Sequence, residues 1–438
     1  MGFVVVGSNA ITKIQSVILA SIIIVAVVAG ILSYVLWNTQ DTSETIKIGV
    51  LADLDSFDGK GIWQGVVLAA EQLNAKGGIL GKHVEIVGQD TDISTGVDAS
   101  KINIALTRLL TYHKVDFIIG VATSAGFMIQ DLIAEHKRLF FEVSSPEDSY
   151  TQRVLEDYDT YKYFFRVAFN ATSIFQGITD ALVLLREQTG FNNVGYIGDD
   201  SGWTKGIMEG LDYVLPQIYG FDLVYKGSSP GSTFDFSSYF AAAETAGVEI
   251  LVPLIGGAIP FVKEYHDRQS PMVIYGGFLG EGVTDPQGWE ITDGKCEYIS
   301  VSSIPLLAGY PLTSKTMPVR EAYINRWGEN PNWFGGYAYE VLRYILSDAI
   351  ERAGTIEPDA VIEALEQVSI ETTNARTFVF TSSHDIMMGE NPNNPDADYV
   401  LALLFQWIDG KQVPVYPKKI MEEAGVTYTF PDWPGPWS

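Results

Sequence analysis

The chain has 438 residues, about three times the length of a typical domain, and should contain more than one hydrophobic core. Its 47% hydrophobic and 19% charged residues are typical of a globular protein and exclude wholesale disorder. The net charge of −26 excludes nucleic acid as the expected partner, because phosphate binding needs clustered Lys and Arg. The single cysteine, Cys296, and five scattered histidines favour neither a disulfide nor a metal site, so we expect no metal and no cofactor.

An apolar segment runs from Val17 to Trp37 without a charged residue. At about 1.5 Å per residue, a helix of this length crosses a hydrocarbon layer of about 30 Å. Lys13 precedes the segment and Asp41 follows it, so the positive-inside rule places residues 1–16 in the cytoplasm and the bulk of the chain outside. We therefore predict a membrane anchor over residues 17–37, followed by a polar linker over residues 38–45.

Two interpretations of the amino terminus stay open. The apolar segment exceeds the ~7–15 residues of an ordinary signal peptide, and no A-x-A site follows it. The sequence SNAITKIQSVILA is similar to the class III, pilin-type signals of archaeal surface proteins, in which cleavage, here after Gly7 or Ala10, leaves the apolar helix in place. The alternative is an anchor that is not cleaved at all.

Apolar strands alternate with amphipathic helices after the linker. The pattern predicts strands at 46–54, 83–90, 115–121 and 139–144, and helices at 62–78, 98–115 and 127–136. Strand–helix alternation with fully apolar strands is typical of a parallel sheet covered on both faces.

The alternation restarts downstream. It predicts helices at 172–190, from 204, at 237–247 and at 260–269, and strands at 193–200, 222–227, 248–257 and 271–278. A later helical block spans 317–327, 336–354 and 359–368. Residues 397–417 read as a β-hairpin that turns at Asp409-Gly410, and the Pro- and Gly-rich residues 430–438 read as irregular.

The two runs predict an α/β fold of two doubly wound parallel-sheet lobes with a cleft between them, at the carboxyl ends of the strands. Common enzyme motifs are missing: the sequence has no G-x-x-x-x-G-K-[ST], no H-E-x-x-H and no G-x-S-x-G. Gly256-Gly257 and Gly276-Gly277 lack the dinucleotide fingerprint and read as turns. Asp199-Asp200 is either a carboxylate pair or a solvated strand end. We therefore expect a protein that is not an enzyme.

Several motifs occur in a fixed order along the chain: LAAEQLNAKGGILGKHVEIV, IIGVATSAG, SSPEDSYT, VGYIGDDSGWTKG, ILVPLIGG, FTSSHDIMMGE and LLFQWIDGKQVPVYP. In this order they resemble the type I periplasmic binding proteins, in the leucine/isoleucine/valine-binding and amide-binding branch. The resemblance begins at Ile46 and runs to the carboxyl terminus. It implies an extracytoplasmic substrate-binding receptor of an ABC importer, with the ABC permease subunits as partners and a small polar solute held in the cleft by hinge closure.

The resemblance also implies a division of the chain between the lobes. Residues 46–166 and 297–378 would form lobe one, and residues 167–296 and 379–438 would form lobe two. A ligand-sensing ectodomain of a signalling or surface assembly is the alternative function, and an enzyme is a third.

In lobe one, the resemblance implies that Ser124, with Thr123 beside it, binds the ligand's carboxylate at the start of a helix, a place that favours anions. The alternative for Ser124 is an N-cap. Ser144 and Ser145 match the family's Ala-Thr at the ligand, although Pro146 departs from that pattern. We expect the Ser144-Ser145 backbone to hold an anionic or amide oxygen.

In lobe two, Trp203 matches an aromatic residue that packs on the ligand, and Glu281 is a candidate partner for an ammonium group, its alternative being a solvated loop carboxylate. The family's second aromatic there is replaced by Ala258-Ile259, which puts an ordinary α-amino acid in doubt. The implied ligand is a branched-chain amino acid, an amide or a related carboxylate. His384 is expected to be structural at the hinge, and Asn170 begins a glycosylation sequon.

Overall fold

The computed structural model describes residues 1–2, 45–92, 98–122, 125–200, 202–280, 283–394 and 396–438, without the side chains of 202 and 203. The chain divides into the units Met1–Thr45 and Ile46–Ser438, and all that follows concerns the second. No helix of the described residues is long and apolar enough to cross a membrane. The anchor predicted over residues 17–37 lies outside them.

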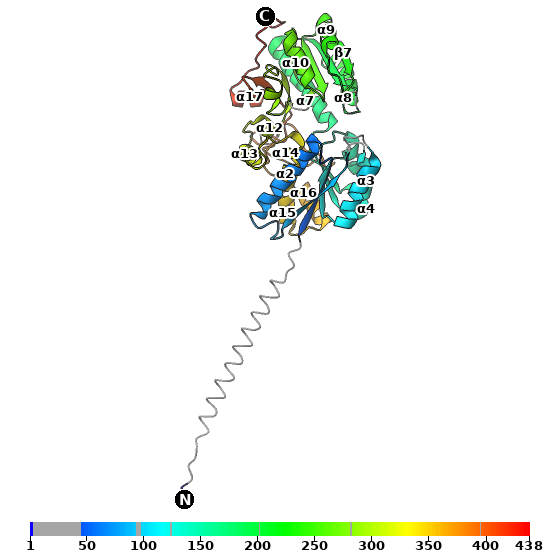
Figure 1. Cartoon of the computed structure of the whole chain (residues 1–438), viewed down its shortest axis with the longest axis vertical. Helices are drawn as coiled ribbons and strands as arrows, with labels where there is room; N and C mark the ends of the chain where they lie inside the picture. Colours follow the sequence, from blue (N-terminus) through cyan, green and yellow to red (C-terminus); the bar gives the residue numbers. More distant parts are fainter. Residues whose placement is uncertain (3–44, 93–97, 123–124, 201, 281–282, 395) are drawn as a thin grey trace. The chain divides into compact units, whose positions relative to one another are not determined.

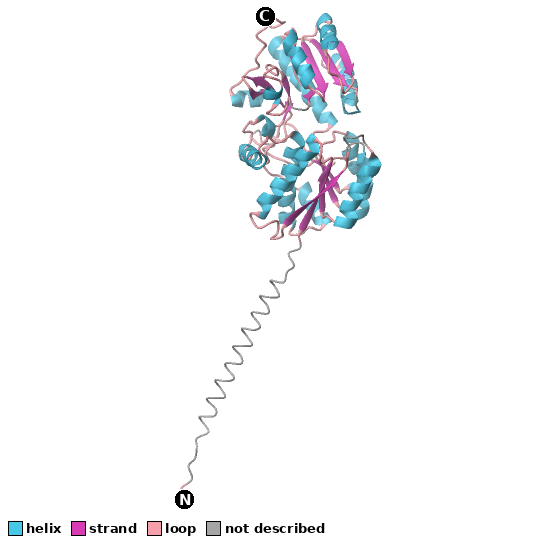
Figure 2. Cartoon of the chain, in the orientation of Figure 1, coloured by secondary structure: helices cyan, strands magenta, loops and turns pink. Residues whose placement is uncertain are grey.

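The first sheet has the strand order β2-β1-β3-β4-β5, with every neighbouring pair parallel. Its central strands are almost wholly apolar and buried, as expected for a sheet covered on both faces. Figure 2 shows helices on both sides of these strands. The elements of this part are β1 (Ile46–Ala52), α2 (Phe57–Asn74), β2 (Val84–Asp90), α3 (Ala99–Thr107), η2 (Arg108–His113), β3 (Phe117–Gly120), α4 (Gly126–His136), β4 (Leu139–Glu142), α5 (Asp148–Glu156), α6 (Tyr158–Tyr161) and β5 (Phe164–Arg166).

The second sheet has the order β10-β8-β6-β7, again parallel, with β9 also paired to β8. Figure 1 shows its green elements at the end of the unit opposite the blue and cyan elements of the first sheet. Its elements are α7 (Ala171–Thr189), β6 (Asn193–Asp199), α8 (Gly202–Gln217), β7 (Asp222–Ser229), α9 (Ser237–Thr245), β8 (Ile250–Ile255), α10 (Ile259–Arg268), β9 (Val273–Ile274), β10 (Phe278–Leu279) and α11 (Gly288–Ile291). The two predicted parallel α/β sheets are thus confirmed.

A smaller antiparallel sheet, β11-β12-β13, completes the fold. The hairpin β12–β13 turns at Asp409 and Gly410, whose φ angles of 50° and 74° suit the predicted two-residue turn. The remaining elements are β11 (Ser300–Ser303), α12 (Pro305–Ala308), α13 (Thr316–Trp327), α14 (Trp333–Glu340), η4 (Val341–Leu346), α15 (Ser347–Ala353), α16 (Pro358–Glu366), β12 (Leu403–Ile408), β13 (Lys411–Tyr416) and α17 (Lys418–Ala424). Residues 430–438 have no regular structure, as predicted.

One predicted strand is split. The sequence predicts a single strand over 271–278, but Gly276 and Gly277 adopt φ angles of 75° and 67° and separate β9 from β10. A Cβ at Gly277 would lie 1.9 Å from the carbonyl oxygen of Pro253, so only glycine fits. After the break, β10 pairs with β8, and Phe278 lies opposite Leu254, near the carboxyl end of β8.

Helices α2 and α14 approach each other closely, which places the start of α14 beside the first sheet. A Cβ at Gly65 would lie 2.1 Å from the carbonyl oxygen of Gly335, so the helices could not pack this closely with larger residues there. Asn332 caps α14 and also donates to the carbonyl of Phe57, at 2.8 Å. These contacts fix Trp333, the first residue of α14.

The buried cores show where the chain passes from one sheet to the other. Residues from Ile46 to Phe169 and from Ile304 to Val400 share the core of the first sheet. Residues 178–301 pack in the two cores of the second sheet, together with parts of the carboxyl-terminal region. The predicted lobe boundaries stay a prediction; these cores favour a last crossing near Val400 rather than at residue 378.

Candidate functional site

A cleft of about 1020 Å³ lies where strands of both sheets end. Its walls come from segments that follow β4, β5 and β6, from β10 and from α14. The cleft thus lies at the carboxyl ends of the parallel strands, the edge at which open parallel sheets bind ligands. The lining residues with polar or aromatic side chains are Asp58, Ser144, Ser145, Glu147, Asp148, Tyr150, Phe169, Thr172, Ser173, Phe175, Phe278, Ser302, Trp333, Phe334 and Tyr416.

The structure places Ser144 and Ser145 on the cleft wall, directly after β4. Their backbone N–H groups, however, point at the protein's own Glu142 and donate to its Oε1 at 2.7 and 2.6 Å. We expected these groups to hold a ligand oxygen. They are occupied because a fully buried carboxylate at the strand end needs hydrogen-bond donors.

Glu142 also joins β4 to the segment after β3, because the backbone N–H of Ala122 donates to its Oε2. Burial raises the pKa of Glu142 to about 7, and the three N–H donors and Arg166 act against that rise. One buried side chain therefore ties the segment after β4, which lines the cleft, to the segment after β3.

The other predicted site residues cannot be placed as contacts. Thr123, Ser124 and Glu281 lie outside the described residues. Trp203 belongs to α8, but the structure does not describe its side chain. Their roles at the ligand stay predictions.

Three aromatic rings that we did not predict line the cleft from three separate segments. Trp333 makes edge contacts with Phe169 and Phe278, with ring centroids 6.0 and 5.8 Å apart and planes 80° and 74° apart. Phe169 follows β5, Phe278 lies in β10 and Trp333 opens α14. No periodic pattern connects these positions, and the only signal is that each is an aromatic residue at an element end. We call these three residues the aromatic corner.

A buried ion pair supports the cleft wall beside the first sheet. Arg166 is fully buried, and its Nε and Nη2 donate to the two carboxylate oxygens of Asp385, with Nε–Oδ1 at 3.0 Å. The guanidinium also donates to the carbonyl of Glu147 at 2.7 Å and to the hydroxyl of Thr151 at 3.0 Å. The pair therefore fixes the segment that follows Ser145.

Two side chains beside this pair join neighbouring elements: Asn170 joins it to α7, and His384 joins β5 to α16. Asn170 caps α7, accepting from Ser173 N–H at 2.6 Å and donating to Asp385 at 2.8 Å. His384 is buried, with Nδ1 3.2 Å from the carbonyl oxygen of Phe164 and Nε2 3.0 Å from Glu366. Burial lowers the pKa of His384, although Glu366 opposes this. These contacts fit the structural role expected for His384.

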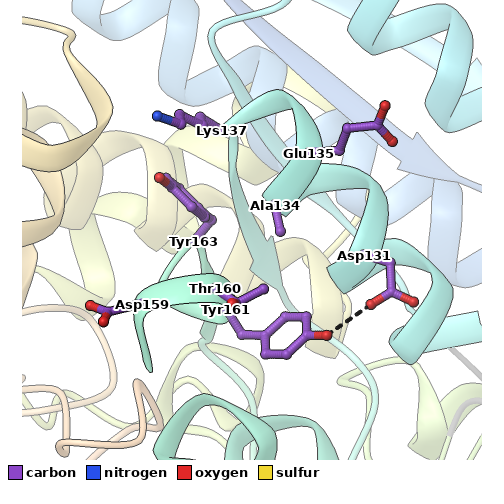
Figure 3. A pocket seen from close by; sticks show the side chains of 8 residues that line it. All are labelled: Asp131, Ala134, Glu135, Lys137, Asp159, Thr160, Tyr161 and Tyr163. Carbon is purple, nitrogen blue, oxygen red and sulfur yellow. Dashed lines mark hydrogen bonds between the residues drawn. The ribbon is translucent and has the colours of Figure 1, made fainter. Parts of the chain in front are cut away.

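A second pocket, of about 340 Å³, lies between α4 and α6 (Figure 3). The hydroxyl of Tyr161 donates to Asp131 at 3.1 Å across it, and Arg153 covers the Tyr161 ring, with its guanidinium carbon 3.8 Å from the ring centroid. Two lining residues, Lys137 and Tyr163, stand just before β4 and β5, so the pocket lies near the amino ends of the strands. That is the edge away from the cleft, and we do not assign the ligand to it.

The described residues contain no group of His, Cys, Asp and Glu side chains able to hold a metal ion. A family model for periplasmic binding proteins matches residues 45–389 of the chain. The chain belongs to the periplasmic binding protein family. The resemblance predicted from the motifs is thus confirmed, whereas the archaeal pilin-type signal stays one of the two interpretations of the amino terminus.

Curated relatives of this periplasmic binding protein are named Leu/Ile/Val-binding protein homologs. It is 24% identical over 373 residues to the Leu/Ile/Val-binding protein homolog 8 of Brucella melitensis, covering 81% of this chain and 85% of the relative. Two solved structures share its fold. A Silicibacter pomeroyi protein described as a branched-chain amino acid ABC transporter has a TM-score of 0.74 at 17% identity, covering 89% of this chain and 100% of that one. A Streptococcus pneumoniae branched-chain amino acid transporter substrate-binding protein in complex with isoleucine has a TM-score of 0.66 at 18% identity, covering 85% and 100%.

Proposed function

We propose that this periplasmic binding protein is the extracytoplasmic substrate-binding receptor of an ABC importer and catalyses no reaction. The observation that carries the proposal is the cleft, which residues of both sheets line in a chain that the family model matches over 45–389. A cavity of about 1020 Å³ lined by apolar and aromatic side chains, with a few polar groups, suits a small molecule.

The ligand would act by closing the cleft. Crossing segments near Phe169, Ile304 and Val400 connect the two sheets, so they are the natural hinge. A ligand stabilises the closed form only to the extent that it binds that form better than the open one. Contacts made from both sheets at once provide such a difference, and the importer would then recognise the closed receptor.

The ligand classes that follow from the resemblance are branched-chain amino acids, amides and related carboxylates. We propose contacts with Ser144 and Ser145 from lobe one, both of which line the cleft, and with Thr123, Ser124, Trp203 and Glu281 on the strength of the motifs.

A thermal-shift screen of the full-length protein against amino acids, amides, urea, amines and carboxylates tests the proposal. A ligand present at 100 times its dissociation constant adds about 2.7 kcal/mol to the unfolding free energy and should raise the melting temperature clearly. Replacing Trp333 by Ala should abolish the shift without removing the folded state. A screen in which no compound raises the melting temperature would contradict the receptor function.

We also propose that residues 17–37 anchor the receptor in the cell membrane, with the bulk of the chain outside. This rests on the length of the apolar segment and on its flanking charges. The full-length protein should sediment with membranes, and a variant lacking residues 1–40 should not. Recovery of mature protein that starts near Thr45 from the medium would refute the anchor.

A further inference from the structure

At the carboxyl ends of β3 and β4, four described backbone donors that could bind a ligand carboxylate already bind the protein itself. The carboxylate of Glu142 accepts hydrogen bonds from the backbone N–H groups of Ala122, Ser144 and Ser145. The N–H of Gly126, at the start of α4, donates to the buried hydroxyl of Tyr150 at 3.3 Å. In a parallel α/β sheet, such strand-end and helix-start donors are the usual place for an anion. Here the buried Glu142 fills that place.

The second sheet repeats the arrangement. Asp199 ends β6, is buried, and accepts the N–H of Gly256, which follows β8, at 2.6 Å. Its pKa is raised by burial, which the Gly256 hydrogen bond opposes. Each sheet thus has a built-in carboxylate at the edge that faces the cleft, bonded to the loop after a neighbouring strand.

The cleft also lacks positive charge. Among the described lining residues none is Lys, Arg or His, whereas Asp58, Glu147 and Asp148 are acidic. Arg166 lies behind the wall, but it is bonded to Asp385 and lies 3.8 Å from Asp148, so its charge is already matched. Acidic residues outnumber basic ones by 54 to 28 over the chain, which adds a negative field. An anionic ligand would be repelled here.

The aromatic corner suits the opposite charge. Phe169 is nearly buried, while Phe278 and Trp333 are partly exposed in the cleft. Aromatic faces attract ammonium groups, Trp most strongly, and several rings at right angles can surround one cation. The same rings offer apolar surface to a hydrocarbon body.

We propose that the ligand of this cleft is an amine or quaternary ammonium compound with an apolar body and no carboxylate. This inference rests on the proposed receptor function and replaces the ligand classes that the resemblance implies with a different one. Glu142 replaces the ligand carboxylate, and the aromatic corner with the acidic lining receives the cation. Specificity follows from repulsion of the wrong charge as much as from attraction of the right one.

Three compounds of one shape test the proposal by calorimetric titration of the full-length protein: leucine, 3-methylbutylamine, which is leucine without its carboxylate, and 4-methylpentanoate, which is leucine without its ammonium. Phenethylamine and 3-phenylpropanoate form a matched aromatic pair. At pH 8, above the pKa of about 7 of Glu142, each amine should bind at least about tenfold more tightly than its carboxylate partner. A carboxylate that binds as well as its amine partner overturns the inference and leaves the receptor function standing.

Glu142→Gln keeps the size and the acceptor oxygen but removes the charge, so the preference for amine over carboxylate should fall by roughly tenfold. Glu340→Gln is the matched control, because Glu340 is equally buried and accepts the N–H groups of Thr373 and Asn374 without lining the cleft. It should leave the preference unchanged. Trp333→Leu, which keeps an apolar side chain at this partly exposed position, should weaken amine binding roughly three- to thirtyfold while sparing the neutral 3-methylbutanol.

An unchanged preference in Glu142→Gln, together with unchanged amine affinity in Trp333→Leu, would refute the assignment of these groups. If amines fail to bind but another class in the wider screen succeeds, the inference fails alone. If no compound of any class binds, the receptor function fails with it.

Discussion

Removing one partner of the buried Arg166–Asp385 pair should destabilise the protein strongly. Asp385→Asn keeps the shape of the side chain and removes its charge. Arg166, which is fully buried, then loses its two hydrogen bonds to a carboxylate. The hydroxyl of Thr151 and the amide of Asn170 lose the same charged acceptor, at 3.1 and 2.8 Å.

The magnitude follows from burial. Breaking a buried pair from one side leaves an uncompensated charge and costs about 3–5 kcal/mol, a large part of a total stability of about 5–15 kcal/mol. The matched control is Glu71→Gln. Arg326 donates to both oxygens of Glu71 at 2.9 Å, but the two side chains are 43% and 45% exposed. Losing that surface pair should cost no more than about 1 kcal/mol.

Urea unfolding of the full-length protein and the two variants measures the difference, with circular dichroism and tryptophan fluorescence recorded together to check that the transitions coincide. Added salt should reduce the effect of Glu71→Gln and leave that of Asp385→Asn nearly unchanged, because buried charges are screened little. An Asp385→Asn cost as small as that of Glu71→Gln would show that the buried pair does not hold the cleft wall beside the first sheet.

Three further outcomes follow from single positions. Because the pKa of Glu142 is raised from 4.5 to about 7, the folded state binds more protons than the unfolded state between these pH values. The unfolding free energy should therefore fall by about 3 kcal/mol from pH 4.5 to 7, relative to Glu142→Gln, as measured by urea titration at each pH. Parallel pH profiles of the two proteins would contradict this. Gly277→Ala should lower the melting temperature far more than Gly220→Ala, although both glycines have similar positive φ, since a Cβ meets Pro253 in the first and nothing within 4 Å in the second. Cys296 is buried with its pKa raised to about 12, so a thiol reagent should label it only after urea unfolds the protein, and rapid labelling of the native state would refute that burial.

Apolar patterning identified most of the strands of both sheets because many of them, such as β1, β3, β4 and β8, are runs of buried residues bounded by polar or glycine turns. It missed β5, which has only the residues Phe164–Arg166, and β11, whose residues Ser300–Ser303 are mostly serine. Helix α5 was missed as well, because Pro146 and a polar sequence hide its start. In these elements tertiary contacts, not local pattern, set the conformation.

The site was harder to predict because its parts are joined by contacts distant in sequence. Ser144 and Ser145 were found at the cleft, but the role of Glu142 depends on Ala122, which only the pairing of β3 with β4 brings near. The aromatic corner joins residues 169, 278 and 333, and nothing in a linear sequence connects them.

Asn170 begins a glycosylation sequon, but in the fold its side chain is already engaged in hydrogen bonds. Residues 170–172 read as an acceptor for an N-linked sugar, which is attached to the side-chain nitrogen. That nitrogen is bonded to the buried Asp385, and the amide oxygen beside it caps α7. A sugar on Asn170 would have to displace the ion pair's carboxylate, so the folded chain is a poor acceptor. A sugar found on Asn170 would therefore indicate that the chain was glycosylated before the contact between Asn170 and Asp385 had formed.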